Sequence, residues 1–595
     1  MQSEKTLRIG GASGYWGESA MSTPQLIKDG SVDFIVYDYL AEVTMSIMAR
    51  ARAANPEAGF AADFVSAVLA PNLAAIAKQG IRIVSNAGGV NPAACGAAIE
   101  TLIRTLGLDL TVAVVEGDDL LARRDEFADV AEMFRETPFP HEQRVASINA
   151  YLGAFPIADA LDKGADIVIT GRVVDSAVTL GACIHHFGWQ AEHFDQLAGG
   201  SIAGHILECG PQATGGNFTD WLSIADSMHD IGYPIANIRQ DGSFDITKPN
   251  DTGGVVNVGT VAEQLLYEVG DPQAYILPDV VCDFSALTIT AKSRDLVEVR
   301  GAIGHAPTDT YKVSATYADG YRAGQTLLFY GEQADRKARL FADAALRRAR
   351  RRLDTQGLTD FDDTLVELIG DESHYGSFRQ VQGSREVLLK VAARHQDKKA
   401  IGILLQEVIG AALAGPPSLT GFAGTRPKPS PVMRLFSFLL DKQAISATVT
   451  IAGKASPAKS ALSSETPKPL RPTPPVYPDT DDIMTAVPLH QLAWGRSGDK
   501  GNKANVGIIA RRAEYLPYLW NALTAEAVHD RFAHFTDQPV DKFLVPGIHA
   551  INFVLHRVLG GGGIASLRND PQGKGYAQLL LDMMIEIPES LAELL

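Results

Sequence analysis

Short apolar runs alternate with helix-like segments along the N-terminal part of the chain. The runs that predict strands are Leu7–Ile9, Asp33–Tyr37, Ile81–Ser85, Leu110–Val115 and Asp166–Ile169. Between them apolar positions recur at helical spacing, and Asn91 followed by Pro92 is a favoured way to begin a helix. Strands that alternate with helices are typical of α/β proteins, so we predict a large α/β domain built on a mainly parallel sheet.

The pattern changes further along the chain. Residues 331–353 predict a charged amphipathic helix, and residues 385–412 predict a helix–turn–helix. Residues 454–480 are rich in Pro, Ser and Lys without apolar periodicity, which predicts a linker. Beyond it, strand-like and helical runs follow a β-β-α-β-β order. We therefore expect an α/β domain at 1–453 and a small ferredoxin-like α+β domain at 481–595.

Composition narrows the class of protein. The chain has 595 residues, of which 46% are hydrophobic and 21% charged, and a formal net charge of −17, as in an ordinary globular protein. Such an acidic chain repels nucleic acid, and the basic run at 347–352 fits a solvated helix face. The four cysteines form no CxxC pair, and no apolar run reaches the length of about 18 residues that spans a membrane. We expect a cytoplasmic homo-oligomer with no nucleic-acid or membrane partner and no metal site.

Polar residues follow every predicted strand, and glycine accompanies them in four of the five cases. The carboxyl ends of parallel strands share one edge of a sheet, where ligands of open α/β folds bind. Glu116 and Asp118 are candidate catalytic acids or bases at this edge. The candidate substrate-binding residues there are Gly11, Ser13, Gly14, Asn86, Gly88, Gly89, Asn91 and Arg172.

Each of these candidates has an alternative. The first loop, GGASGYWG, is followed about 20 residues later by Asp38, which also suits an NAD(P) site. Its glycine spacing is GxxGxxG, however, and the next helix start is at Ser22, so a plain structural turn is the other possibility. In the same way, Asn91 could serve only to cap its own helix, and Arg172 could serve only to pair with Asp175.

The stretch HILECG places His205 and Glu208 three residues apart, on one face of the segment if it is helical. A His–Glu pair suits a general base and the residue that orients it, so both are candidate catalytic residues. Cys209 is a possible nucleophile, and Asn217 in the glycine-rich stretch that follows is a candidate substrate ligand. A buried structural histidine is the alternative.

The densest polar cluster, GRSGDKGNKANVG, lies in the C-terminal part. Its candidate substrate-binding residues are Arg496, Ser497, Asp499, Lys500 and Asn502. Arg496 and Lys500 suit a phosphate, for example one on CoA. The cluster either completes the site of the large domain or is a solvated hairpin loop.

Several motifs together resemble the acyclic terpene utilisation protein AtuA family. They are RIGGASGYWGES, SNAGGVNP, ITGRVVDSAVTLG, GHILECGPQATGGNFTDW and TVAEQLLYEVGDP. The stretch AWGRSGDKGNKANVG resembles the ferredoxin-fold domain that accompanies that family, so the resemblance covers nearly all of the chain except the linker. It implies a place in the bacterial catabolism of citronellol and geraniol, which proceeds through branched acyl-CoA thioesters. It assigns no role to any residue.

We therefore expect a cytoplasmic catabolic enzyme of acyclic terpene or branched acyl-CoA degradation, a hydratase or dehydratase acting on a CoA thioester. Such a hydro-lyase needs an acid, a base and backbone donors for an enolate oxygen. It needs no cofactor, and CoA enters only as part of the acyl-CoA or related carboxylate substrate. One alternative is an NAD(P)-dependent oxidoreductase that uses the N-terminal glycine loop. Another is a non-catalytic acyl-CoA-binding or scaffold subunit.

Overall fold

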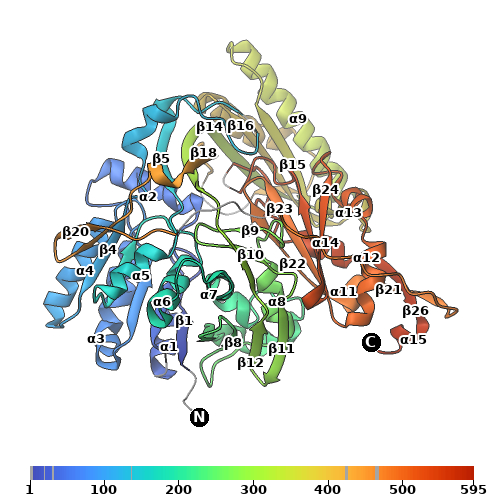
Figure 1. The fold of residues 1–595 in the computed structure, drawn as a ribbon. Helices are drawn as coiled ribbons and strands as arrows, with labels where there is room; N and C mark the ends of the chain where they lie inside the picture. The colour runs from blue at the N-terminus through green and yellow to red at the C-terminus, as the bar shows by residue number, and fades with distance from the viewer. Residues whose placement is uncertain are drawn as a thin grey trace.

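The computed structural model describes residues 5–18, 20–29, 32–135, 137–421, 426–461, 468–563 and 565–595. Its largest element is a sheet of eleven strands in the body of the molecule (Figure 1). From edge to edge these strands are β11 (Thr288–Ser293), β12 (Leu296–Arg300), β8 (Phe244–Thr247), β7 (Ile235–Arg239), β1 (Thr6–Gly11), β2 (Phe34–Tyr37), β3 (Arg82–Ser85), β6 (Ile167–Thr170), β4 (Val112–Glu116), β19 (Thr448–Ile451) and β20 (Lys454–Pro457).

The five strands that the sequence predicts lie together at the centre of this sheet. β1, β2, β3, β6 and β4 run parallel to one another. The strands on either side of them are antiparallel, because hairpins rather than helical crossovers extend both edges. The sheet is therefore mixed, which corrects the expectation of a mainly parallel one. The last of these hairpins uses Lys454–Pro457, the first four residues of the segment expected to be a linker.

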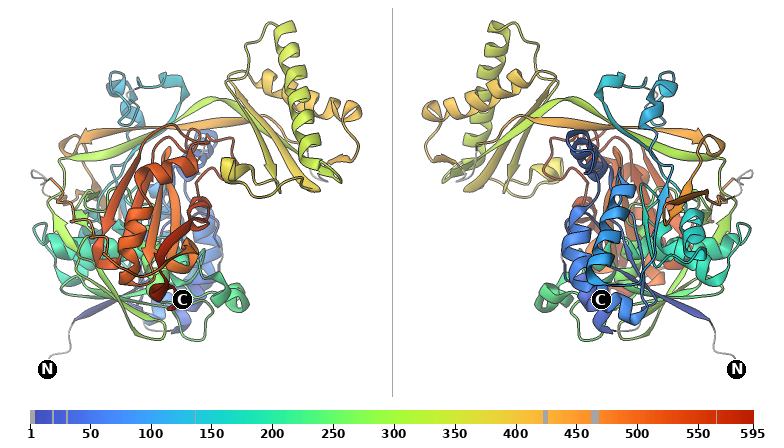
Figure 2. Two further views of the ribbon diagram at one scale, coloured as in Figure 1. Left: turned by 90° about the vertical axis from the view of Figure 1, so that its right-hand side faces the viewer. Right: turned by 90° about the vertical axis from the view of Figure 1, so that its left-hand side faces the viewer.

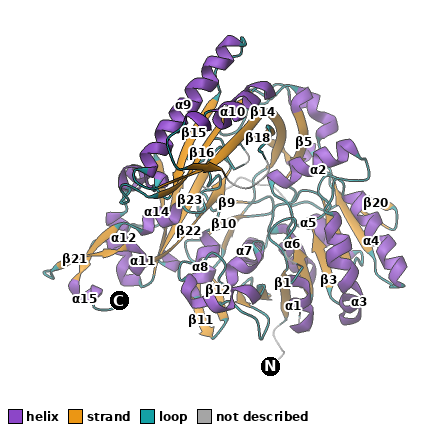
Figure 3. Cartoon of the chain, turned by 180° about the vertical axis from the view of Figure 1, so that it is seen from behind, coloured by secondary structure: helices purple, strands orange, loops and turns teal. Residues whose placement is uncertain are grey.

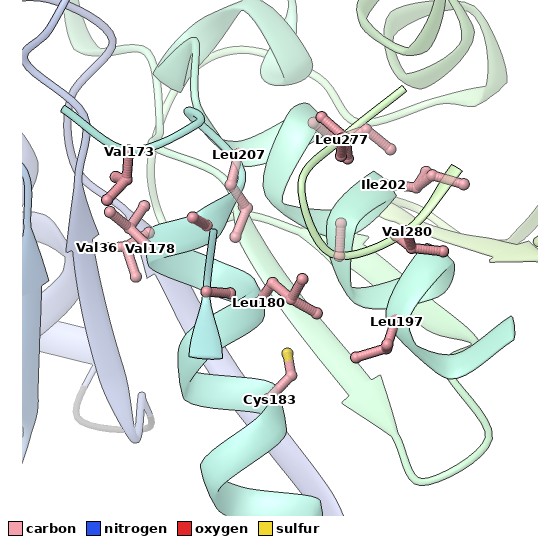
Figure 4. Close-up of a cluster of buried hydrophobic side chains, with 14 of the residues drawn as sticks. Val36, Val173, Val178, Leu180, Cys183, Leu197, Ile202, Leu207, Leu277 and Val280 are labelled. Atoms are coloured by element: carbon pink, nitrogen blue, oxygen red, sulfur yellow. The ribbon is translucent and has the colours of Figure 1, made fainter. Parts of the chain in front are cut away.

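Both faces of the central strands are buried. In β2, Phe34 and Val36 belong to the core on one face, and Ile35 and Tyr37 to the core on the other. The helices that contribute to the first core are α5 (Phe155–Asp162), α6 (Ala177–Phe187), α7 (Phe194–Leu207) and α8 (Val258–Leu266). The helices that contribute to the second are α1 (Ser22–Asp29), α2 (Glu42–Ala54), α3 (Ala70–Gln79) and α4 (Pro92–Leu106). Figure 4 shows α6 and α7 packed together in the first core through side chains such as Leu180, Cys183 and Leu197.

A second sheet links the body to a projecting lobe (Figure 2). Its long strand β14 (Thr310–Tyr330) pairs first with β5 (Val145–Ala150) and β18 (Ser430–Asp441). Further along, the same strand pairs with β16 (Glu386–His395) and β17 (Leu419–Gly421), while β15 (Asp363–Ile369) pairs with β16. The lobe consists of this end of the sheet with α9 (Ala334–Thr355) and α10 (Lys398–Gly410), which share a separate core.

One prediction for the residues of this lobe is wrong. The range 385–412 contains a strand and a helix, β16 and α10, rather than a helix–turn–helix. Val387, Leu389 and Val391 are buried in alternation along β16, because this strand lies between β14 and β15.

Three further strands, β9 (Tyr275–Ile276), β10 (Val281–Asp283) and β13 (Ile303–His305), form a small sheet beside α7.

The C-terminal domain is built on an antiparallel sheet of four strands. In spatial order they are β22 (Ala493–Lys500), β23 (Lys503–Ala510), β25 (Ala550–Leu555) and β24 (Val540–Val545). The helices α11 (Leu489–Leu492), α12 (Leu516–Ala522), α13 (Ala525–Phe532) and α14 (Tyr576–Leu581) share one core with this sheet. A separate ribbon of β21 (Met484–Pro488) and β26 (Met584–Pro588), followed by α15 (Glu589–Ala592), completes this ferredoxin-like domain.

The described part of the segment between the domains contacts both of them. Arg471 forms an ion pair with Asp271 of the large domain at 2.6 Å and lies over the ring of Phe543 in the C-terminal domain. None of the helices within the described residues is long and apolar enough to cross a membrane.

Candidate active site

The predicted edge of the parallel strands forms a connected polar network. Asp38 follows β2 and is buried, and Asn86, which follows β3, donates its side-chain amide to the Asp38 carboxylate. The Asn86 side-chain oxygen accepts the backbone N–H of Tyr39 at 2.7 Å, and the Ser13 hydroxyl donates to the Asp38 carbonyl at 3.0 Å. Burial raises the pKa of Asp38 well above its ordinary value, and the charge of Asp175 raises it further.

Arg172 lies beside this network, after β6. Its guanidinium donates to Asp175 at 2.6 Å and stacks on the ring of Tyr151, 4.2 Å from the ring centre. Its backbone N–H donates to Asp118 at 2.8 Å, and Asn149 donates to the same carboxylate oxygen at 2.8 Å. Burial raises the pKa of Asp118 to about 7. Asp118 therefore holds the turn that carries Arg172.

His205 and Glu208 meet at the C-terminal end of α7, as their spacing predicts. The His205 Nδ1 lies 3.1 Å from the Glu208 Oε1, and the His205 Nε2 donates to the carbonyl of Leu265 at 3.2 Å. The two side chains are 1% and 9% exposed. Burial raises the pKa of Glu208, the charge of His205 lowers it, and Asp175 raises it again. The contact between them has the distance of an ion pair, although the His205 Nδ1 forms no hydrogen bond within the described residues.

Two other candidates, Cys209 and Asn217, follow Glu208 along the chain. Burial and the charge of Glu208 raise the pKa of the Cys209 thiol well above its ordinary value, which keeps it protonated. Asn217 is exposed and has a positive φ of 58°. Its carbonyl accepts a hydrogen bond from Arg496 of the C-terminal domain at 3.2 Å.

The first glycine loop packs directly on this end of α7. A Cβ at Gly11 would lie 2.7 Å from the Leu207 carbonyl oxygen, and one at Gly14 would lie 2.9 Å from the Cys209 Cα. The Gly14 N–H already donates to Glu18 at 2.6 Å. These glycines let the loop after β1 approach the segment that carries Glu208 closely. The loop therefore packs against that segment and fixes its position.

The second glycine loop has a similar packing role. A Cβ at Gly88 would lie 2.5 Å from the Thr170 carbonyl oxygen, and Gly89 has a positive φ of 56°. Asn91 caps α4 by accepting the N–H of Ala94 at 3.4 Å, which confirms the predicted helix start. Neighbouring strands and helices thus meet closely at the edge where Asn86 contacts Asp38.

The C-terminal cluster GRSGDKGN forms the β22–β23 hairpin and faces the large domain. Arg496 lies over the ring of Tyr267, 4.6 Å from its centre. A Cβ at Gly498 would lie 2.5 Å from the same ring, so this glycine permits close contact between the domains. The Asn505 side chain donates to the Leu266 carbonyl at 2.6 Å and accepts the Glu268 N–H at 2.9 Å.

The other predicted residues of the hairpin contact neighbouring segments of the C-terminal domain. The Ser497 hydroxyl is buried and donates to the Gly573 carbonyl at 2.7 Å. Asn502 accepts the N–H of Gly561 at 2.9 Å. Asp499 lies 3.7 Å from Lys574. Lys500 is exposed at the end of β22.

The hairpin brings a cation to the site that sequence reasoning missed. The Lys574 ammonium donates to the Tyr267 hydroxyl and lies 3.4 Å from Glu268. Its charge lowers the pKa of Cys209, and the charge of Glu268 raises the pKa of Glu208. Lys574 is 40% exposed, whereas His205 and Glu208 are nearly fully buried. No spacing in the sequence connects residues 267, 268 and 574.

Tyr275 is a further missed residue, with its ring centre 5.5 Å from that of His205. Glu116 ends β4 beside Thr448 of β19, and no described contact joins it to Glu208. Within the described residues, no group of three or more His, Cys, Asp and Glu side chains is placed to hold a metal ion. The structure thus brings together Asp38, Asp175, Arg172, His205 and Glu208 at one edge, with Lys574 on the solvent side.

Comparison with known families agrees with this two-domain arrangement. Residues 7–451 match the model of the acyclic terpene utilisation family protein AtuA, and residues 487–586 match that of the AtuA ferredoxin-like domain. No curated protein and no solved structure matches the sequence significantly.

Proposed function

Because the chain belongs to the acyclic terpene utilisation family AtuA, we propose that it is a catabolic hydro-lyase that adds water to, or removes it from, a branched CoA thioester. The observation that carries this proposal is the buried His205–Glu208 pair at the edge of the parallel strands. The pair lies within electrostatic reach of two further carboxyl groups, those of Asp38 and Asp175.

Hydration of an enoyl thioester requires two proton transfers. A base accepts a proton from water as its oxygen bonds to the β-carbon, and an acid delivers a proton to the α-carbon; dehydration is the reverse. Glu208 is suited to both transfers, because burial raises its pKa. His205 is held by the Leu265 carbonyl beside Glu208 and acts as the positioning residue of that carboxyl group. Asp38 is a second buried carboxyl, and burial raises its pKa well above the ordinary value.

The substrate is negatively charged, and the chain as a whole carries a net charge of −17. Binding therefore requires positively charged side chains close to the substrate. Lys574 and Lys500 supply cations on the solvent side of the cluster, from the C-terminal domain. Arg172 lies beside Asp175. In this proposal the CoA phosphates meet the lysines, and the acyl end reaches Glu208.

The decisive experiment incubates the purified full-length chain with branched enoyl-CoA and 3-hydroxyacyl-CoA esters and follows their interconversion. The expected result is turnover that Glu208→Gln lowers at least about 100-fold in kcat with little change in KM. Asp279→Asn is the matched control, because Asp279 is also a buried carboxyl, with its pKa raised to about 6, but it accepts the Ala154 N–H instead. It is expected to retain activity.

Two results would contradict the proposal. Absence of any hydration or dehydration across the panel would overturn the reaction class; thioester binding without turnover would then favour a non-catalytic acyl-CoA-binding subunit. Equal loss of activity in Glu208→Gln and Asp279→Asn would instead overturn the assignment of Glu208. A fluorescence titration with NADH and NADPH distinguishes the oxidoreductase alternative, for which binding is required.

A further inference from the structure

The lobe carries an open groove that the candidate active site does not use. The groove has a volume of about 670 Å³ and lies between α9 and the segment that follows α10. Its lining combines the apolar Leu340 and Phe341 with three cations, Arg336, Lys337 and Arg348, and one carboxylate, Glu332. Leu340 is 56% exposed, and Leu413 on the adjoining segment is fully exposed. We call this feature the lobe groove.

Two of the three cations that line the lobe groove, Arg336 and Lys337, have no ion-pair partner within the residues that the structure describes. Arg336 donates to the Gln333 side chain at 3.3 Å, and Lys337 donates to the Tyr330 carbonyl at 3.0 Å. The third, Arg348, pairs with a glutamate, as Arg352 does, and Arg339 further along α9 pairs with an aspartate. The lobe groove therefore offers two available positive charges beside exposed apolar surface.

A surface with the opposite character lies on the C-terminal domain. Residues 476–488 and 583–595, which include β21, β26 and α15, contain no Lys or Arg. Their acidic residues are Asp479, Asp481, Asp482, Glu586, Glu589 and Glu593. Ile483 and Met584 are 70% and 56% exposed. We call this surface the acidic tip; no described ion pair neutralises its carboxylates.

We propose that the acidic tip of one copy of the chain docks into the lobe groove of a second copy. The two surfaces are complementary in charge, and both expose large apolar side chains. α9 and the β21–β26 ribbon lie on the same side of the molecule, in Figure 1 and again in the reverse view of Figure 3. In this proposal a two-fold axis pairs each groove with the other copy's tip, so that two identical contacts close the dimer.

Charge reversal on the full-length chain tests this proposal by sedimentation equilibrium at low ionic strength. The unaltered chain is expected to form a dimer. Arg336→Glu with Lys337→Glu, or Asp481→Lys with Asp482→Lys, is expected to raise its dissociation constant at least about 30-fold, because each reversal acts at both contacts. Arg347→Glu with Arg351→Glu is the matched control: it makes the same charge change on exposed positions of α9 that do not line the lobe groove, and it is expected to leave the dimer unchanged.

Mixing the two reversed chains supplies the sharper test. In a mixed dimer, an unaltered groove meets an unaltered tip at one contact, and a reversed groove meets a reversed tip at the other. The equimolar mixture is therefore expected to dimerise although each variant alone does not, which also shows that both variants are folded. A chain that is monomeric at low ionic strength, a dimer insensitive to both reversals, or a mixture that stays monomeric would each overturn the proposal.

Discussion

The close contact between the domains at Gly498 leads to a quantitative prediction for Gly498→Ala. The added methyl group would lie 2.5 Å from the Tyr267 ring and 2.8 Å from the Glu268 Cγ, whereas nonbonded carbon atoms prefer about 3.5–4.0 Å. The ring would have to move by about 1 Å to restore that separation. It is held on its face by Arg496 and at its hydroxyl by Lys574. Such overpacking costs about 1–3 kcal/mol.

Urea unfolding of the variant and the unaltered chain measures this cost. Gly498→Ala is expected to lose about 2 kcal/mol in the transition that separates the domains, and to lose activity because Lys574 shifts with the ring. Gly270→Ala is the matched control from the same interface, since a Cβ there meets nothing within 4 Å. An unchanged urea midpoint for Gly498→Ala would refute the argument that this glycine sets the distance between the domains.

Two further predictions concern protonation. Burial raises the pKa of Glu263 to about 7, so the folded chain retains a proton there that the unfolded chain releases above about pH 4.5. The free energy of unfolding should therefore fall by up to about 3 kcal/mol between about pH 4.5 and 7, and Glu263→Gln should remove that fall in urea titrations; an identical slope in both proteins would contradict the assignment. Cys209→Ala is expected to keep kcat within about threefold, because a thiol whose pKa is raised is a poor nucleophile; loss of all turnover would instead identify Cys209 as the nucleophile.

The elements that the sequence predicts well are those with strong local signals. The five central strands and the Asn91–Pro92 helix start depend on neighbouring residues, and the structure confirms them, with strand bounds shifted by at most two residues. The segment VLLKVAAR of β16 contains residues that also suit a helix, and only its place between β14 and β15 makes it a strand. The antiparallel edges of the large sheet likewise depend on pairing between distant segments.

The same distinction applies to the candidate site. The His205–Glu208 contact follows from a spacing of three residues on one helical face. The roles of Gly11 and Gly14 do not follow from the sequence, because a glycine loop beside a ligand and one packed on a helix end contain the same residues. Tyr267 and Lys574 come together only when the domains dock, so no local pattern indicates their contact.

The asparagine contacts between the domains have a consequence for how such a chain can be divided. Asn505 satisfies the Leu266 carbonyl, and Asn552 donates to the carbonyls of Val269 and Gly270 at 2.9 and 2.7 Å. If the two domains were encoded by separate genes, or if one were exchanged for a distant homologue, these main-chain groups would lose their donors unless the new partner presented amides at the same places. The two parts are thus expected to be inherited and exchanged together, and a split version should function only when its halves are produced side by side.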